Sequence, residues 1–376
     1  MARRKYGEGS VFLRKDGRYV AQVKLENRKN KQTYHKTEKD AQVALRKMLG
    51  ELEQGTLATG KQQTLKAYLE DWLKDVVKPS AHSIGTYNMY RIVVEKHVIP
   101  SLGHVRLQQL KPQQVQGFYA RLLKEGLGQK RVRSIHSVLR KALENAVKWN
   151  LVSRNVCNLV NPPIPRRYEI QPLTYEQAQK LITTAYQHKL QALITVAITT
   201  GMRRGELLGL HWQDIDLEKG SLQIRRSVNR IGKHGIVVSE PKTKGSRRKI
   251  MLPAFVVEVL KEHRVKQQEM KANALDAWRD MDIVFCSLVG TYIEPSNLHE
   301  WFKKLLKDAE LPDIRFHDLR HSAATILLGM GVHPKVVQEL LGHSNISMTM
   351  DTYSHVLPSM QSEAMDKMDN LFKPKP

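Results

Sequence analysis

Cysteine and long apolar stretches are scarce in this sequence. Cys157 and Cys286 are the only cysteines among 376 residues, which excludes a disulfide framework and a cysteine-based zinc finger and fits a reducing cytoplasm. The first ten residues lack the apolar core of a signal peptide. The apolar stretch at 190–200 is too short to span a bilayer and contains threonines, so we expect a buried helix there and no membrane association.

Acidic side chains are also few compared with basic ones. The chain has 61 Lys and Arg against 37 Asp and Glu, a net charge of +24, and a pI near 9.9. Such an excess attracts and holds the phosphates of a polyanion. Because the positive charge is spread over every segment, we favour DNA or RNA as the partner over a basic protein without one. The length predicts two or three domains.

Residues 1–60 predict a small basic unit of three strands and one helix. Asp16-Gly17 is a typical tight-turn pair between the first two strands. Thr37 and Asp40 form a capping pattern at the start of the helix. Such a sheet can lie in the major groove of DNA, which we favour over a purely structural cap. The buried face of the second strand is expected to contain Tyr19, Ala21, Val23 and Leu25.

Residues 64–160 predict a bundle of four helices. Thr64 caps the first, which we expect to end at Pro79, and the second is expected to stop at Pro100 and Gly103. The fourth helix has a basic surface, which is either merely solvated or, as we favour here, faces phosphates. The expected buried stripes are Leu65, Tyr68, Leu69, Trp72 and Leu73, then Ile135, Leu139, Leu143 and Val147. The basic residues are Lys130, Arg131, Arg133, Arg140 and Lys141.

A proline-rich connection at 161–167 indicates a domain boundary, after which helices and short strands are mixed. Gly201 is expected to end a buried helix. Arg203 and Glu206 are spaced to emerge on one face at the start of the next helix. Strands are expected at 221–229, 235–242 and 246–253, with hairpin turns at GKHG and TKGS.

The segment from 315 to 356 contains the remaining candidate site residues. His317 and Arg320 share a helical face by their spacing. Gly342 is a C-cap glycine that places His343 just beyond a helix end, and Tyr353 follows ten residues later. Two arginines, a lysine, two histidines and a tyrosine can transfer a phosphoryl group of a nucleic acid without a metal.

Four segments resemble, in order and spacing, the boxes of the tyrosine recombinases, also called the phage-integrase family. They are TGMRRGELLGL, PKTKGSRRKI, HDLRHSAAT and LLGHSNISMTMDTYSHV. The upstream layout is similar to integrases of temperate phages and conjugative transposons. The resemblance implies a multidomain, mainly α fold with small β elements. It implies an arm-type DNA-binding domain at 1–60, a helical, SAM-like core-binding domain at 64–160 and a mixed α+β catalytic domain at 168–376.

The resemblance also implies an activity, a site-specific DNA recombinase that integrates and excises a mobile element. Tyr353 is the expected nucleophile, which attacks in line and leaves a 3′-phosphotyrosyl link and a free 5′ hydroxyl. Arg203 and Arg320 are expected to clamp the non-bridging phosphate oxygens, which planar guanidinium groups fit, with His343 as a further donor. Strand exchange then passes through a Holliday junction.

Three further residues have expected roles in proton transfer or support. Lys242 would protonate the leaving 5′ oxygen as general acid, with Lys244 as the alternative. His317 would assist proton movement at the tyrosine. Glu206 either orients Arg203 or a histidine, or is an ordinary helix-start carboxylate near the helix dipole.

The expected partners follow from the same resemblance. They are double-stranded DNA at core and arm attachment sites, three further copies in a homotetramer, and an excisionase and a host DNA-bending protein, all in the nucleoid of a bacterial cell. No cofactor is expected because the phosphotyrosine conserves the bond energy. Several histidines could suggest a metal site, but no HExxH motif or cysteine cluster accompanies them.

Two other functions remain open, a nicking–closing enzyme similar to type IB topoisomerases and an architectural DNA-binding protein with a decayed site. The amino-terminal sheet and the bundle favour the integrase, and the complete set of six residues argues against decay. The C-terminal apolar pattern is either a helix packed on its own domain or a tail that docks on a neighbouring protomer. That pattern consists of Met360, Met365, Met368, Leu371 and Phe372.

Overall fold

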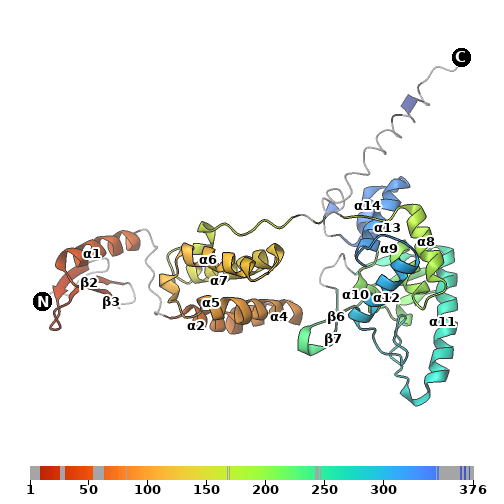
Figure 1. Cartoon of the computed structure of the whole chain (residues 1–376), viewed down its shortest axis with the longest axis horizontal. Coiled ribbons are helices and arrows are strands. Elements are labelled where there is room, and N and C mark those ends of the chain that lie inside the picture. Colours follow the sequence, from red (N-terminus) through yellow and green to blue (C-terminus); the bar gives the residue numbers. More distant parts are fainter. Residues whose placement is uncertain are drawn as a thin grey trace. The chain divides into compact units, whose positions relative to one another are not determined.

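The computed structural model divides into two compact units, Met1–Arg167 and Tyr168–Pro376 (Figure 1). It describes residues 9–25, 30–53, 63–81, 83–166, 168, 170–241, 245, 247–343, 345–346, 365, 368–369 and 372. Helices dominate both units, and the strands form small sheets, as the expected fold class requires. Among the described helices, none is long and apolar enough to cross a membrane.

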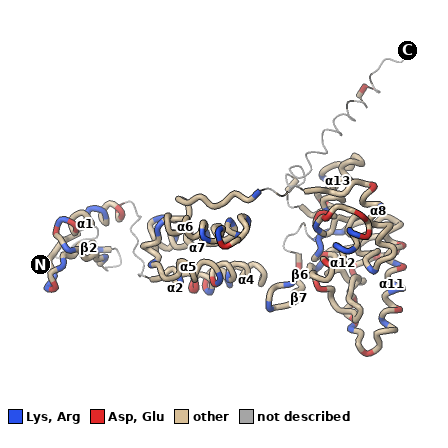
Figure 2. The backbone as a smooth tube through the Cα atoms, in the orientation of Figure 1, with Lys and Arg blue, Asp and Glu red and all other residues tan. Residues whose placement is uncertain are grey.

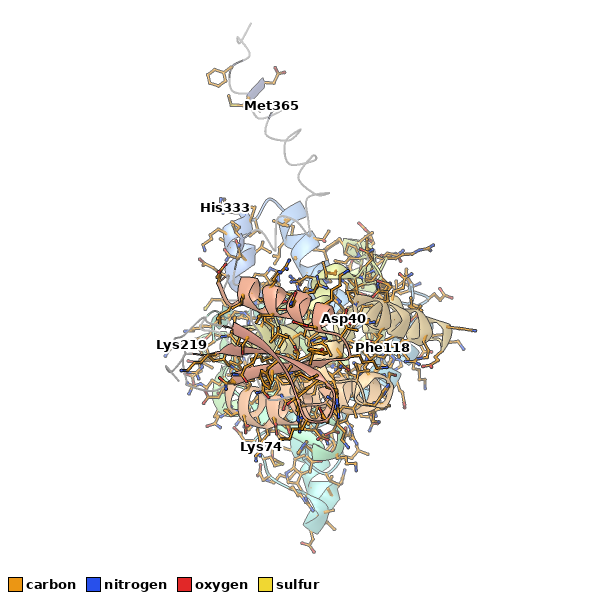
Figure 3. The ribbon with its side chains drawn as sticks, turned by 90° about the vertical axis from the view of Figure 1, so that its left-hand side faces the viewer. Asp40, Lys74, Phe118, Lys219, His333 and Met365 are labelled. Carbon is orange, nitrogen blue, oxygen red and sulfur yellow. The ribbon has the colours of Figure 1, made fainter. Side chains whose placement is uncertain are left out.

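The first unit begins with a three-stranded antiparallel sheet and one helix. Strands β1 (Gly9–Leu13), β2 (Tyr19–Lys24) and β3 (Asn30–His35) lie in this order, and α1 (Glu38–Glu53) packs on the sheet. Gly17 turns the first hairpin with a φ of 79°. The Thr37 hydroxyl caps α1 by accepting from the Asp40 amide and donates to the Asp40 carboxylate (Asp40 is labelled in Figure 3). The predicted apolar face of β2 is confirmed.

A helical bundle follows, with its own hydrophobic core. Its long helices are α6 (Pro112–Lys124) and α7 (Gln129–Lys148), and the Thr64 hydroxyl caps α2 (Leu65–Trp72) as predicted. The predicted buried stripes are confirmed except at Val147, which is only half-buried while its neighbour Ala146 is buried. Two short 3₁₀ helices complete the bundle, Leu107–Gln109 and Val156–Leu159.

The first helix ends at Ser80, one residue past Pro79, and Gly103 ends the second as predicted, whereas Pro100 lies inside the second helix. In the first helix, a π-helical turn at Leu73–Val77 separates α2 from α3 (Lys78–Ser80). In the second, a π turn at Val94–Val98 separates α4 (Ile84–Val93) from α5 (Ile99–Leu102), which Gly103 ends. Each proline therefore follows a wider turn with i→i−5 hydrogen bonding. A widened turn shifts the carbonyl that a proline ring would otherwise meet, and the chain continues past it.

The second unit is built around one buried helix, α9 (Gln191–Thr200). It packs against α8 (Tyr175–Ala185), α11 (Ala254–Ala274) and α13 (Asp318–Gly329) (Figure 1). Two further helices, α12 (Pro295–Asp308) and α14 (Pro334–Leu341), pack on α8 and α13 respectively. As predicted, Gly201 ends α9 in the left-handed conformation, with a φ of 61°. This glycine allows the chain to turn directly into the candidate site.

The strands of this unit differ from the prediction. The expected strand at 221–229 is two strands, β5 (Ser221–Gln223) and β6 (Ser227–Arg230), in different sheets. Arg225 and Arg226 lie between the two strands, and both pair with Asp214. β6 forms the predicted GKHG hairpin with β7 (Ile236–Ser239), whereas β8 (Lys249–Met251) pairs with β5, which also pairs with β4 (Ile215–Asp216). β7 and β8, the strands on either side of TKGS, therefore lie in different sheets, and the second predicted hairpin is not formed.

Candidate active site

Arg203 lies where the chain leaves α9 and enters the short helix α10 (Arg204–Leu208). It is the N-cap residue, and its amide donates to Glu206 Oε2 at 3.0 Å while Nη1 donates to Glu206 Oε1 at 2.8 Å. The predicted shared face of these two residues is thus confirmed. Nη2 of Arg203 also donates to the Gly342 carbonyl at 3.3 Å, which connects α10 to the end of α14.

Glu206 is buried between two arginines. Arg248, just before β8, donates from Nη2 to Glu206 Oε2 at 3.1 Å, and the carboxylate is only 3% exposed. Burial alone would raise the pKa of Glu206, but Arg248 and Arg203 outweigh this, so the pKa lies below its ordinary value. Glu206 is therefore ionised at neutral pH and holds Arg203 through a charged contact.

Arg320 and His317 lie at the start of α13. Arg320 is 2% exposed, and its Nη1 donates to the Gly201 carbonyl at 2.8 Å. His317 is the N-cap residue, and its ring packs edge-on against His321 with 5.1 Å between centroids. The helix start is secured by the buried Asp318, which accepts from Arg315.

His343 follows the C-cap of α14, as predicted. Gly342 adopts the left-handed conformation with a φ of 68°, and the Gln338 side chain donates to the His343 carbonyl at 3.0 Å. At the other end of α14, the His333 ring caps the helix by accepting from the Lys335 amide (Figure 3). Both ends of this helix are thus capped, which holds His343 in place.

The histidines of the site are neutral at physiological pH. Burial, together with the positive charges of Arg320 and Arg203, lowers the pKa of His343 to about 4. Burial and the neighbouring His317 lower the pKa of His321 to about 4. Burial and the charge of Arg320 lower the pKa of His317. Neutral imidazoles close to two guanidinium groups can both donate to a phosphate oxygen and accept a proton.

The structure thus brings Arg203, Glu206, His317, Arg320 and His343 into one site from three separate stretches of chain. Lys242, its alternative Lys244 and the expected nucleophile Tyr353 lie outside the described residues. Of the C-terminal apolar pattern, Met360 and Leu371 also lie outside the described residues, whereas Met365, Met368 and Phe372 are described and exposed.

Arg248 was not among the predicted site residues. The sequence feature that could have identified Arg248 is the alternation of side chains along the strand. Ile250 and Arg248 lie on the buried side, whereas Lys249 and Arg247 are exposed. An arginine on the buried side of a strand requires a buried partner, and the carboxylate of Glu206 was available in the sequence.

Comparison with known proteins identifies, over most of the chain, the same family that the sequence motifs resemble. The model of the phage integrase family matches residues 171–360, and that of the phage integrase N-terminal SAM-like domain matches 64–123. A tyrosine recombinase XerC-like protein of Caldanaerobacter subterraneus subsp. tengcongensis is 33% identical over 360 residues, which cover 91% of this chain and 92% of the relative.

Two solved structures show the same fold. The Tn1549 transposon integrase in complex with a circular intermediate DNA is 21% identical, with a TM-score of 0.65 over 80% of this chain and 99% of that one. A lambda integrase tetramer bound to a Holliday junction is 17% identical, with a TM-score of 0.55 over 89% and 95%.

The chain belongs to the phage integrase family. It is a tyrosine recombinase, a site-specific enzyme that transfers DNA strands. The nicking–closing and architectural alternatives are accordingly set aside.

The tight packing at Gly342 predicts a specific sensitivity to substitution. A Cβ there would lie 2.7 Å from the Gly245 carbonyl oxygen and 2.9 Å from Arg248 Nη1, in addition to the strain of a positive φ. Gly342→Ala should therefore lower the melting temperature and slow DNA cleavage.

The matched control is Gly331→Ala, which has a φ of 79° but open space around its Cβ. It should show only the backbone cost of about 1–2 kcal/mol, with cleavage unchanged. Equal effects of the two substitutions on both measurements would contradict the packing argument.

The lowered histidine pKa values predict a loss of stability in acid. Because His321 and His343 have a pKa of about 4 in the folded chain and near 6.5 otherwise, the unfolded chain binds more protons between these values. Their contribution to stability is full above pH 6.5 and falls as the pH is lowered toward 4. The melting temperature of the wild type should drop more between pH 7.5 and pH 5 than that of a His321→Gln/His343→Gln variant. An identical drop in both proteins would contradict this.

Proposed function

We propose that this recombinase integrates and excises a mobile genetic element through a 3′-phosphotyrosyl intermediate and a Holliday junction. The observation that carries the proposal is the convergence of Arg203, Arg320 and His343 on one site from distant parts of the chain. Two fixed guanidinium groups beside a neutral imidazole fit the charge that develops on a phosphate under attack. The likeness to a transposon integrase supports a mobile element as the substrate.

The proposed roles follow the chemistry of each group. Tyr353 is the nucleophile, and Arg203, Arg320 and His343 stabilise the non-bridging oxygens. Lys242, or Lys244 in its place, protonates the leaving 5′ oxygen. His317, which is neutral, assists the tyrosine proton. The reaction conserves bond energy in the phosphotyrosine and needs no nucleotide.

The proposed division of labour places arm-site binding in 1–60, core-site binding in 64–160 and catalysis in 168–376. Separate hydrophobic cores in these three stretches support it. Figure 2 shows Lys and Arg distributed over both units, as binding to a DNA backbone requires. A homotetramer on DNA is the proposed assembly, supported by the likeness to lambda integrase. An excisionase and a host DNA-bending protein are further proposed partners, and the bacterial nucleoid is the proposed location.

The nucleophile is tested by Tyr353→Phe on genomic DNA fragments. The wild type should form a covalent adduct, and sequencing its attached 3′ ends should map the core site. The variant should bind the same DNA but form no adduct, because phenylalanine lacks the attacking oxygen. The matched control Tyr186→Phe, at an exposed tyrosine of α8's C-terminal end, should behave as the wild type. An adduct with Tyr353→Phe would refute the assignment.

A basic groove on α7 is the proposed phosphate-facing surface of 64–160. The groove has a volume of about 520 Å³, and its lining combines cations predicted from the sequence with further residues. Four cations and one carboxylate contribute: Arg133, Arg140, Lys141, Lys148 and Glu144. The Glu144 carboxylate accepts a hydrogen bond from the Asn155 side chain at 3.0 Å.

Single removal of Arg133 or Lys148 should weaken binding to core-site DNA. Each should also lower the slope of log affinity against log salt by about 1, because one phosphate contact is lost. Lys66→Ala, at an exposed lysine of α2 that pairs with Glu70, is the matched control and should leave the slope unchanged. The measurement is fluorescence anisotropy over a range of salt concentrations, and equal slopes in all variants would contradict the surface.

A further inference from the structure

Arg248 joins three elements of the active-site region. It precedes β8, and its Nη1 and Nη2 donate to the two oxygens of Glu206 at 3.4 and 3.1 Å. Its Nε donates to the Leu340 carbonyl at 2.5 Å. Leu340 lies in the last turn of α14, where carbonyls lack partners within the helix. One side chain thus connects the strand, the carboxylate beside Arg203 and the helix that ends at His343.

The exposure of the two arginines separates their tasks. The Arg203 side chain is 37% exposed, whereas that of Arg248 is 8% exposed. All three nitrogens of the Arg248 guanidinium donate to Glu206 or Leu340, so the group faces the protein interior. Arg203 can reach a phosphate from this position, and Arg248 supports it from behind.

The carboxylate depends on Arg248 for its charge. A buried carboxylate without a compensating cation takes up a proton, and a neutral acid holds an arginine less firmly. The charged groups that face Glu206 are Arg203, from the start of α10, and Arg248, from before β8. Since Arg203 already donates to Glu206 with its amide and Nη1, any loss of charge on Glu206 is transmitted to Arg203.

The backbone after α14 also packs on Arg248. A Cβ at Gly342 would lie 3.2 Å from Arg248 Cδ, and the Gly342 carbonyl accepts from Arg203. The two arginines therefore contact the same glycine, one through packing and one through a hydrogen bond. His343 is the next residue, so its position is coupled to both.

We propose that Arg248 is a positioning residue for strand transfer, which keeps Glu206 ionised and so fixes Arg203 and the turn before His343 for phosphate binding. This inference rests on the proposed role of Arg203. It adds an eighth side chain to the seven expected from the sequence, one that does not itself touch the DNA.

The test compares single-turnover cleavage of the mapped core duplex, nicked to trap the adduct, from pH 5.5 to 8.5. Arg248→Met should slow cleavage at pH 7 by about 10–100-fold, by analogy with the losses seen when residues that support metal ligands are replaced. Its acid limb should move to higher pH, because Glu206 then protonates more readily. Arg248→Lys should restore much of the rate, since it returns the positive charge.

A double variant separates positioning from folding. The double variant Glu206→Gln/Arg248→Met lacks both charges of the buried pair, and Arg248→Met added to Glu206→Gln should slow cleavage by less than about threefold further, because the two residues act as one unit. Arg226→Met breaks another ion pair, between the partly exposed Arg226 and the buried Asp214, and is the control for a structural loss. It should lower the melting temperature without moving the acid limb.

The outcomes are distinguishable. Arg248→Met with wild-type rate and pH profile would overturn the inference, and so would Arg226→Met with the same shifted acid limb. Additive losses in the double variant would also overturn it. Failure of the wild type to form any adduct would instead refute the proposed phosphotyrosyl mechanism.

Discussion

One carboxylate, Glu206, is shared by two arginines of different roles, and the active-site region depends on this contact. Its oxygens accept from the amide and guanidinium of Arg203 on one side and from Arg248 on the other. In a buried setting, a carboxylate between two cations is stable only when all three groups are present. The arrangement fixes an arginine for a phosphate by balancing charge inside the protein, before any DNA is bound.

The same region shows how distant segments of a chain are joined. The buried helix α9 ends at Gly201, whose carbonyl accepts from Arg320 of α13 and whose α-carbon lies against Leu341 of α14. A side chain at this position would push α14 away, since an added Cβ would lie 2.5 Å from Leu341 Cδ2. Close packing of three helices at one glycine therefore brings Arg203, Arg320 and His343 together, although more than a hundred residues of sequence separate the first from the other two.

Local signals in the sequence were sufficient for much of the fold. The caps at Thr37 and Thr64 and the left-handed glycines at Gly201 and Gly342 were predictable because each satisfies backbone groups of its own helix. The pairing of β8 with β5 was not, because the two strands are distant in the sequence, with β6 and β7 between them, and no local signal specifies the partner. The sequence motifs identified Arg203 and Arg320, whereas the role of Arg248 can be recognised only from its tertiary contacts.

The two π turns of the bundle have a consequence for comparing this chain with its relatives. A π turn holds one residue more than the α-helical turn it replaces, so each marks the place of a single-residue insertion. In Leu73–Val77 and in Val94–Val98 the turn comes directly before the proline-containing segment. A relative with an uninterrupted α-helix at either place aligns correctly only with a one-residue gap there. Without that gap, the residues beyond it are matched one position out of register, about 100° around the helix, and similarity in this part of the bundle is underestimated.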